Sequence, residues 1–166
     1  MRPSEHCRLP YRQPTDFEMT DAALIAAARA AALRAYAPYS NFSVGCAVES
    51  VDGQIVTGAN MENACYRLGL CAELSALTLA QATFGLDKVA RIAVAGGDGS
   101  GSELAGASAV TPCGGCRQSI LEAAQLSGRD IEIMCASGDG TVIERHTIGA
   151  LLPFGFGPAN LTDASG

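Results

Sequence analysis

Three cysteines lie where two predicted helices begin, and their spacing is typical of a metal site. Cys113 and Cys116 are three residues apart, so both side chains can face one point from the first turn of a helix. Cys71 precedes another predicted helix. Structural zinc sites are closed by four protein ligands, whereas catalytic sites keep a position for water. Three cysteines without a fourth ligand at a matching spacing therefore predict a catalytic site that holds one Zn²⁺ per chain.

Glu73 follows Cys71 by two residues and is placed to handle the protons of a zinc-bound water. Zinc lowers the pKa of such a water from about 15.7 towards 7, which makes hydroxide available at neutral pH. One carboxylate can accept this proton and pass it to a substrate nitrogen and to the leaving group. We therefore predict that Glu73 is catalytic, in a hydrolytic deamination. In the alternative, Cys65 or Cys135 is a fourth ligand and the zinc is structural.

The elements that must position these residues alternate along the chain. The expected helices cover residues 21–36, 72–83 and 113–124, and the expected strands cover 42–51, 55–60, 89–95, 131–135 and 141–147. Thr20 and Asp21 form the expected N-cap of the first helix. This order predicts the α/β class, with a single mixed five-stranded sheet flanked by helices on both faces. The expected domain is 19–162, between tails at 1–18 and 163–166.

Composition and charge limit the classes of function. The chain has 166 residues, 48% of them hydrophobic, which is sufficient for one domain with a real core. Its net charge of −6 and only 11 Lys plus Arg argue against nucleic acid and favour small uncharged substrates. An odd number of cysteines, a C-x-x-C pair and no secretion signal favour a reducing, cytoplasmic location. No run approaches the ~18 apolar residues of a membrane span, and Asp16, Glu18 and Asp21 are expected to form a solvated acidic patch.

Four ordered motifs resemble the small zinc-dependent cytidine deaminases. Residues 35–45 are similar to the N-terminal motif of that family, and residues 60–73 to its core, which ends in Cys71-Ala72-Glu73. Residues 112–118 match its second zinc motif, and residues 151–158 its C-terminal motif. The Cys-x-Glu and Pro-Cys-x-x-Cys pattern is that of the zinc deaminases in its three-cysteine form. The resemblance runs from about residue 20 to 162 and implies the α/β/α sandwich of the family.

The resemblance also implies which residues bind the substrate. Asn60 and Glu62 match the pair that holds the ribose hydroxyls, and side chains at i and i+2 of a strand end do project to one side. Phe42 matches an aromatic residue beside the pyrimidine, and Ala72 is another implied contact. In the family, the segment that matches Ala64 to Tyr66 reaches into an adjoining site, and the residue that matches Phe156 comes from a neighbouring subunit. A homotetramer with shared active sites is therefore implied.

One position departs from the family pattern. Many three-cysteine members have Arg after the catalytic Glu, where this chain has Leu74. Three thiolates on Zn²⁺ leave a net charge of −1, so we predict that Arg117 or Arg67 offsets part of this charge from within hydrogen-bonding reach of a ligand sulfur. The predicted reaction is deamination of cytidine and 2′-deoxycytidine in pyrimidine salvage. The alternatives are a deaminase of another aminopyrimidine nucleoside, such as the blasticidin type, and a non-catalytic zinc-stabilised binding protein.

Overall fold

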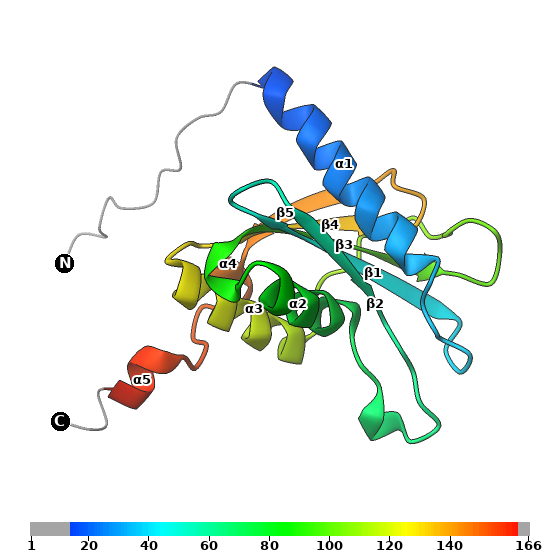
Figure 1. Cartoon of the computed structure of the whole chain (residues 1–166). Coiled ribbons are helices and arrows are strands. Elements are labelled where there is room, and N and C mark those ends of the chain that lie inside the picture. Colours follow the sequence, from blue (N-terminus) through cyan, green and yellow to red (C-terminus); the bar gives the residue numbers. More distant parts are fainter. Residues whose placement is uncertain (1–13, 163–166) are drawn as a thin grey trace.

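The computed structural model describes residues 14–162, with the side chains of residues 21–158, 160 and 161 (Figure 1). Residues 1–13 and the expected C-terminal tail at 163–166 lie outside the described residues. Helix α1 (Pro14–Ala32) begins within the segment predicted as a tail and ends before the predicted boundary at residue 36.

Five strands form one sheet in the order β2-β1-β3-β4-β5. Their bounds are β1 Phe42–Ser50, β2 Ile55–Ala59, β3 Val89–Asp98, β4 Glu132–Ser137 and β5 Ile143–Thr147. β3 and β4 are parallel, and the other neighbours are antiparallel. The predicted mixed five-stranded sheet is confirmed.

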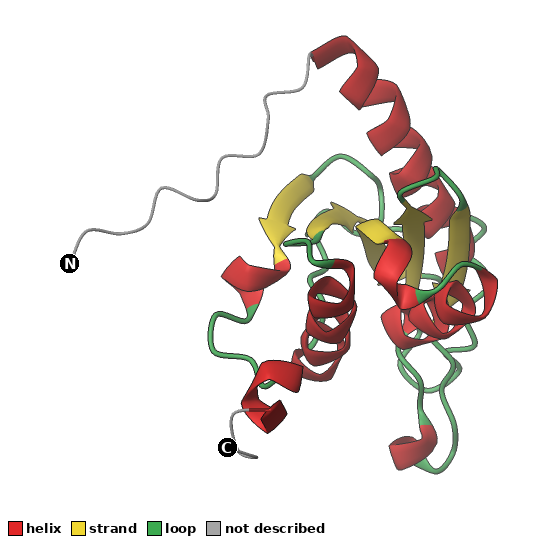
Figure 2. Cartoon of the chain, turned by 60° about the vertical axis from the view of Figure 1, so that its left-hand side comes forward, coloured by secondary structure: helices red, strands yellow, loops and turns green. Residues whose placement is uncertain are grey.

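Helices cover both faces of this sheet, as predicted (Figures 1 and 2). On one face, α1 packs through Leu24 and Ala28 on small side chains of the strands: Ala47, Ala93, Ala95 and Ala136. A Cβ atom at Gly45 would lie 2.0 Å from the Ala28 carbonyl oxygen, so this close approach of α1 to β1 requires glycine. On the other face, α2 (Ala72–Thr83) and α3 (Gly114–Ser127) enclose the larger core, which includes Cys46, Val94, Ile120 and Ile133.

Asp21 lies within α1 and not at its N-cap, which corrects the predicted helix start. Its side chain is buried and its carboxylate pairs with Arg91 of β3 and with Arg145 of β5, the latter at 2.7 Å. Arg91 alternates with Ala93 and Ala95 along β3 and therefore faces α1. The predicted solvated acidic patch is wrong for Asp21, because two arginines on the sheet compensate its charge.

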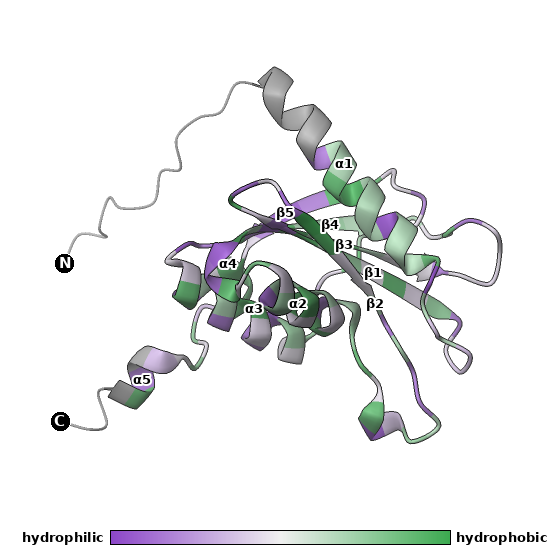
Figure 3. Cartoon of the chain, in the orientation of Figure 1, coloured by the Kyte–Doolittle hydropathy of each residue, from purple (hydrophilic) through white to green (hydrophobic). Residues whose placement is uncertain are grey.

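Short helices complete the chain: η1 Tyr66–Leu68, η2 Leu86–Lys88, α4 Ile148–Leu151 and α5 Pro158–Thr162. These short elements were not predicted from the sequence. Figure 3 shows hydrophobic residues between the helices and the sheet, and others on the protruding segment that contains η1. Over residues 14–162, none of the helices combines the length and the apolar character that a membrane span requires.

Candidate active site

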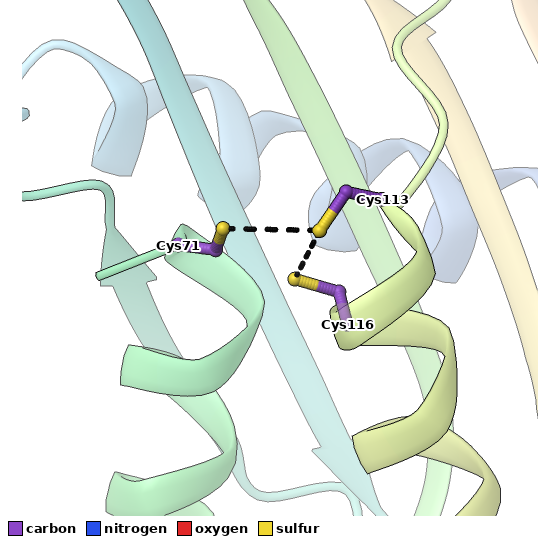
Figure 4. A group of neighbouring side chains, drawn as sticks. All are labelled: Cys71, Cys113 and Cys116. Carbon is purple, nitrogen blue, oxygen red and sulfur yellow. Dashed lines mark hydrogen bonds between the residues drawn. The ribbon is translucent and has the colours of Figure 1, made fainter. Parts of the chain in front are cut away.

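The three predicted zinc ligands meet between the N-termini of α2 and α3 (Figure 4). Cys71 is the N-cap residue of α2, Cys113 is the N-cap residue of α3, and Cys116 lies in the first turn of α3. The Cys113 sulfur lies 4.0 Å from that of Cys71 and 3.5 Å from that of Cys116. All three sulfurs lie within 4.8 Å of one another. The C-x-x-C spacing thus places two ligands on one helix end, and the fold brings the third to them.

These sulfur positions fit a zinc ion. A Zn–S bond of about 2.3 Å with tetrahedral angles requires sulfurs about 3.8 Å apart, which is within a few tenths of an ångström of both distances. Among the described residues, the cluster contains these three cysteines and no other potential ligand. Cys65 and Cys135 are not part of it, so neither closes the site as the structural alternative requires.

The two helix ends supply positive potential to this cluster. Unpaired N–H groups give a helix N-terminus the equivalent of about half a positive charge. The backbone N–H of Cys116 lowers the pKa of the Cys113 thiol, whereas burial raises the pKa of Cys71. Burial also raises the pKa of Cys116, and the negative charge of Glu73 raises it further. Cys113 is thus the one cysteine of the three with a lowered pKa, and a bound cation would favour the thiolate form of the other two.

Glu73 lies in the first turn of α2, beside the sulfur cluster. Its side chain is only 4% exposed. It lines the same cavity as Cys71 and Cys113, and its charge contributes to the raised pKa values of Cys71 and Cys116. Because Cys71 and Glu73 flank Ala72 at the start of one helix, the ligand and the carboxylate are held in a fixed relation.

Met61 joins the chain segments around the cluster. Its backbone pairs with Leu70 through two hydrogen bonds of 2.9 Å, and it forms a parallel bridge with Tyr36. Asn60 and Glu62, on either side of Met61, are bonded to Tyr36 through their backbones. This pairing places the predicted sugar-binding residues beside Cys71.

A cavity of about 400 Å³ opens at this point, a size suited to a small molecule. Of the predicted residues, six line it: Asn60, Glu62, Cys71, Ala72, Glu73 and Cys113. Sequence reasoning missed the other lining residues: Val44, Met61, Gly69, Leu70, Val110 and Thr111. Val110 and Thr111 directly precede Pro112 and Cys113 in the sequence, and this position could have identified these two as lining residues.

The family is decided by a match over residues 18–127 to the model of the cytidine and deoxycytidylate deaminase zinc-binding region. This range is more than half of the chain and includes all three cysteines. The chain belongs to the cytidine deaminase family. As a member, it is a zinc-dependent hydrolase, and the match together with the sulfur geometry confirms the predicted zinc cofactor.

Relatives in this family align with most of the chain. A cytidine deaminase of Mycobacterium tuberculosis is 42% identical over 127 residues, which are 76% of this chain and 82% of that protein. A cytidine deaminase of Sporosarcina psychrophila is 36% identical over 142 residues, 86% of this chain and 95% of that protein. The crystal structure of a cytidine deaminase from Burkholderia pseudomallei superposes with a TM-score of 0.68 at 40% identity, covering 81% of this chain and 98% of that one.

The side chains of Asn60 and Glu62 are held in place by neighbouring backbone. Asn60 Oδ1 accepts a hydrogen bond from Val44 N (2.8 Å), and its Nδ2 donates to Phe42 O (3.0 Å). Glu62 accepts from Tyr39 N (2.9 Å) and from the amide and hydroxyl of Ser40. The Ser40 hydroxyl is the main cause that lowers the pKa of Glu62, so its carboxylate is ionised at neutral pH.

The other residues that the family resemblance assigned to the substrate do not line the cavity of this chain. Phe42 begins β1 and is half exposed, and Ala64 and Tyr66 lie on the protruding segment. The Tyr66 ring is 79% exposed and contacts Tyr39 edge-on, with the ring centroids 5.9 Å apart. Phe156 is 58% exposed beyond α4. None of these four residues belongs to the lining of the cavity that contains Cys71 and Cys113.

The predicted hydrogen bond from an arginine to a ligand sulfur is wrong for the described residues. Arg117 Nε donates to Pro112 O (2.8 Å), and its Nη1 donates to Leu151 O (3.1 Å). Arg67 is exposed on η1. The N-termini of α2 and α3 together supply the equivalent of about one positive charge, so the helix ends can offset the surplus thiolate without an arginine.

Proposed function

We propose that this chain hydrolyses cytidine and 2′-deoxycytidine to the corresponding uracil nucleosides and ammonia, in cytoplasmic nucleoside salvage. The proposal is carried by one observation: a single cavity of about 400 Å³ is lined by two of the clustered cysteines, Cys71 and Cys113, by the buried Glu73, and by the pair Asn60 and Glu62. Several relatives bear the name cytidine deaminase, which supports cytidine as the substrate.

Glu73 carries the proton transfers. Zinc, when bound at the three cysteines, lowers the pKa of a water molecule at its open position. Glu73 accepts the proton of that water as the water oxygen adds to C4 of the pyrimidine. It passes this proton to ring N3. It then takes the remaining proton from the oxygen now bonded to C4 and passes it to the amino group, so that the C4–N bond breaks, ammonia leaves and the C4 oxygen becomes a carbonyl. The burial of Glu73 keeps bulk water away from these transfers.

Asn60 and Glu62 orient the sugar. The ionised Glu62 carboxylate can accept hydrogen bonds from sugar hydroxyls, and the fixed Asn60 amide can both donate and accept. Since 2′-deoxycytidine retains the 3′-hydroxyl, we expect it to remain a substrate.

The charge of the cavity favours a nucleoside over a nucleotide. Its lining contains Glu62 and Glu73 and no Lys, Arg or His among the described residues. A 5′-phosphate would meet carboxylates without a cationic partner, which costs several kcal/mol. We expect kcat/KM for cytidine to exceed that for CMP by about 100-fold or more. Steady-state rates from the absorbance change of both compounds, with adenosine as a negative control, measure this ratio.

The outcomes separate the candidate functions. Turnover of CMP within tenfold of cytidine would contradict the assignment to free nucleosides. Turnover of another aminopyrimidine nucleoside but not of cytidine would favour the blasticidin-type alternative. A zinc-containing protein that releases no ammonia from any of them would be a binding protein.

We also propose that the chain functions as a homotetramer with active sites shared between subunits. Exposed aromatic side chains support this assembly, because Tyr66 and Phe156 lie on separate protruding segments and away from the cavity of their own subunit. Burial of such side chains against another copy would stabilise the assembly.

A mixing experiment tests the shared site. Subunits that carry Phe156→Ala and subunits that carry Glu73→Ala are each expected to be nearly inactive alone. If Phe156 acts in the site of a neighbour, random mixing in equal amounts rebuilds both residues in about a quarter of the sites. Denaturation and joint refolding, followed by activity and sedimentation measurements, would detect this recovery. No gain over the separate proteins, with tetramers present, would contradict the sharing of sites.

A further inference from the structure

Arg117 occupies an unusual position for a cation. It follows Cys116 in the second turn of α3, close to the positive end of the helix dipole. None of the ion pairs between described residues includes Arg117. Placing a half-buried guanidinium without a carboxylate partner near a helix N-terminus costs free energy unless hydrogen bonds compensate for the lost solvation.

Both of its hydrogen bonds go to backbone carbonyls that the helix itself does not satisfy. Pro112 O belongs to the peptide that leads into Cys113, and it lies 2.8 Å from Arg117 Nε. Leu151 O closes the C-terminal end of α4, where carbonyls lack partners within the helix, and it lies 3.1 Å from Nη1. The rigid fork of a guanidinium can hold two such oxygens at fixed separation, whereas an ammonium is a point charge.

The contact with Pro112 bears directly on the metal cluster. The peptide between Pro112 and Cys113 sets where the Cys113 side chain starts, and Cys116 lies in the same helix as Arg117. Arg117 extends from the helix and holds Pro112 O, and it thereby fixes the Cys113 sulfur relative to the Cys116 sulfur, which lies 3.5 Å away. The Pro112 side chain at this peptide is fully buried.

We propose that Arg117 is a positioning residue for the zinc site, which acts by holding the Pro112 carbonyl against α3 and not by contact with a ligand sulfur. The role rests on the zinc binding of the proposed function. Groups that orient metal ligands typically contribute 10- to 100-fold to metal affinity or activity. The same range is expected for Arg117.

The test is the rate of zinc release to a chromophoric chelator from the full-length, zinc-loaded protein. Arg117→Met is expected to release zinc roughly 10- to 100-fold faster than the unmodified protein. Arg117→Lys keeps the charge without the fork and is also expected to release zinc faster. Gln118→Leu is the matched control, since Gln118 donates to Phe156 O from the same helix but does not touch Pro112. Arg129→Met, beyond the end of α3, controls for charge.

Each outcome decides the role. Zinc release at the wild-type rate in both Arg117 variants would overturn the proposed role. A wild-type rate in Arg117→Lys alone would also overturn it, because the positive charge and not the two hydrogen bonds of the guanidinium would then explain the effect of Arg117→Met. Equal acceleration in Gln118→Leu would assign the effect to the C-terminal segment instead. If Arg117→Met does not fold, as judged by circular dichroism, Arg117→Lys decides. Absence of zinc from the unmodified protein would refute the proposed function itself.

Discussion

Replacement of Glu73 by Gln is expected to lower kcat for cytidine by about 10²- to 10⁴-fold, the usual contribution of a general acid–base. Gln has nearly the same shape as Glu but cannot accept the proton of the water or return it to N3 and the amino group. One side chain serves both transfers, so its replacement affects both. The other carboxylate of the cavity, Glu62, is not free to replace it, because it already accepts hydrogen bonds from Tyr39 and Ser40.

The experiment requires that the zinc site and fold survive. Zinc content by atomic absorption and the melting temperature should remain close to those of the unmodified protein, since Glu73 is not one of the clustered ligands. Glu103→Gln, on the exposed loop between β3 and α3, is the matched control and should retain full activity. More than a few per cent of activity in zinc-loaded Glu73→Gln would refute the assigned role.

Replacement of Cys113 by Ala is expected to remove both zinc and turnover. Cys113 is the middle sulfur of the cluster and the one whose pKa is lowered by a backbone N–H, so its loss leaves two ligands that burial disfavours as thiolates. A metal stabilises the transition state by several kcal/mol, so its loss is expected to lower kcat by roughly 10³-fold. Zinc content and activity measured on the same preparation would show this.

Two other cysteines provide the comparison. Cys65→Ala and Cys135→Ala should retain zinc, since neither sulfur belongs to the cluster. Loss of zinc from either variant would restore the closed, structural site as the explanation. Chelation of the unmodified protein should abolish turnover, and added Zn²⁺ should restore it; persistence of activity after complete zinc removal would contradict a metal-dependent reaction.

The local features of this protein follow from its sequence. The periodicity of residues 72–83 predicted α2 with its observed bounds, because apolar side chains at helical spacing are a local property of this segment. In the same way, the spacing of three residues from Cys113 to Cys116 places both sulfurs at one helix end. The cysteines of the metal cluster, the place of Glu73 beside them and the mixed sheet were therefore predictable.

Only the tertiary structure decided how distant segments meet. Met61 pairs with Leu70 and with Tyr36, and Met61 and Leu70 both line the cavity; no local spacing indicates that these backbones pair. The sequence alone predicted Asp21 as a solvated N-cap residue, whereas in the structure it pairs with Arg91 and Arg145 from two strands. Arg117 stands next to a ligand in sequence, yet its position on α3 directs it to backbone oxygens, one of them on α4. Spacing along the chain determines which side chains share a face of one element, whereas the partners of that face depend on packing between elements.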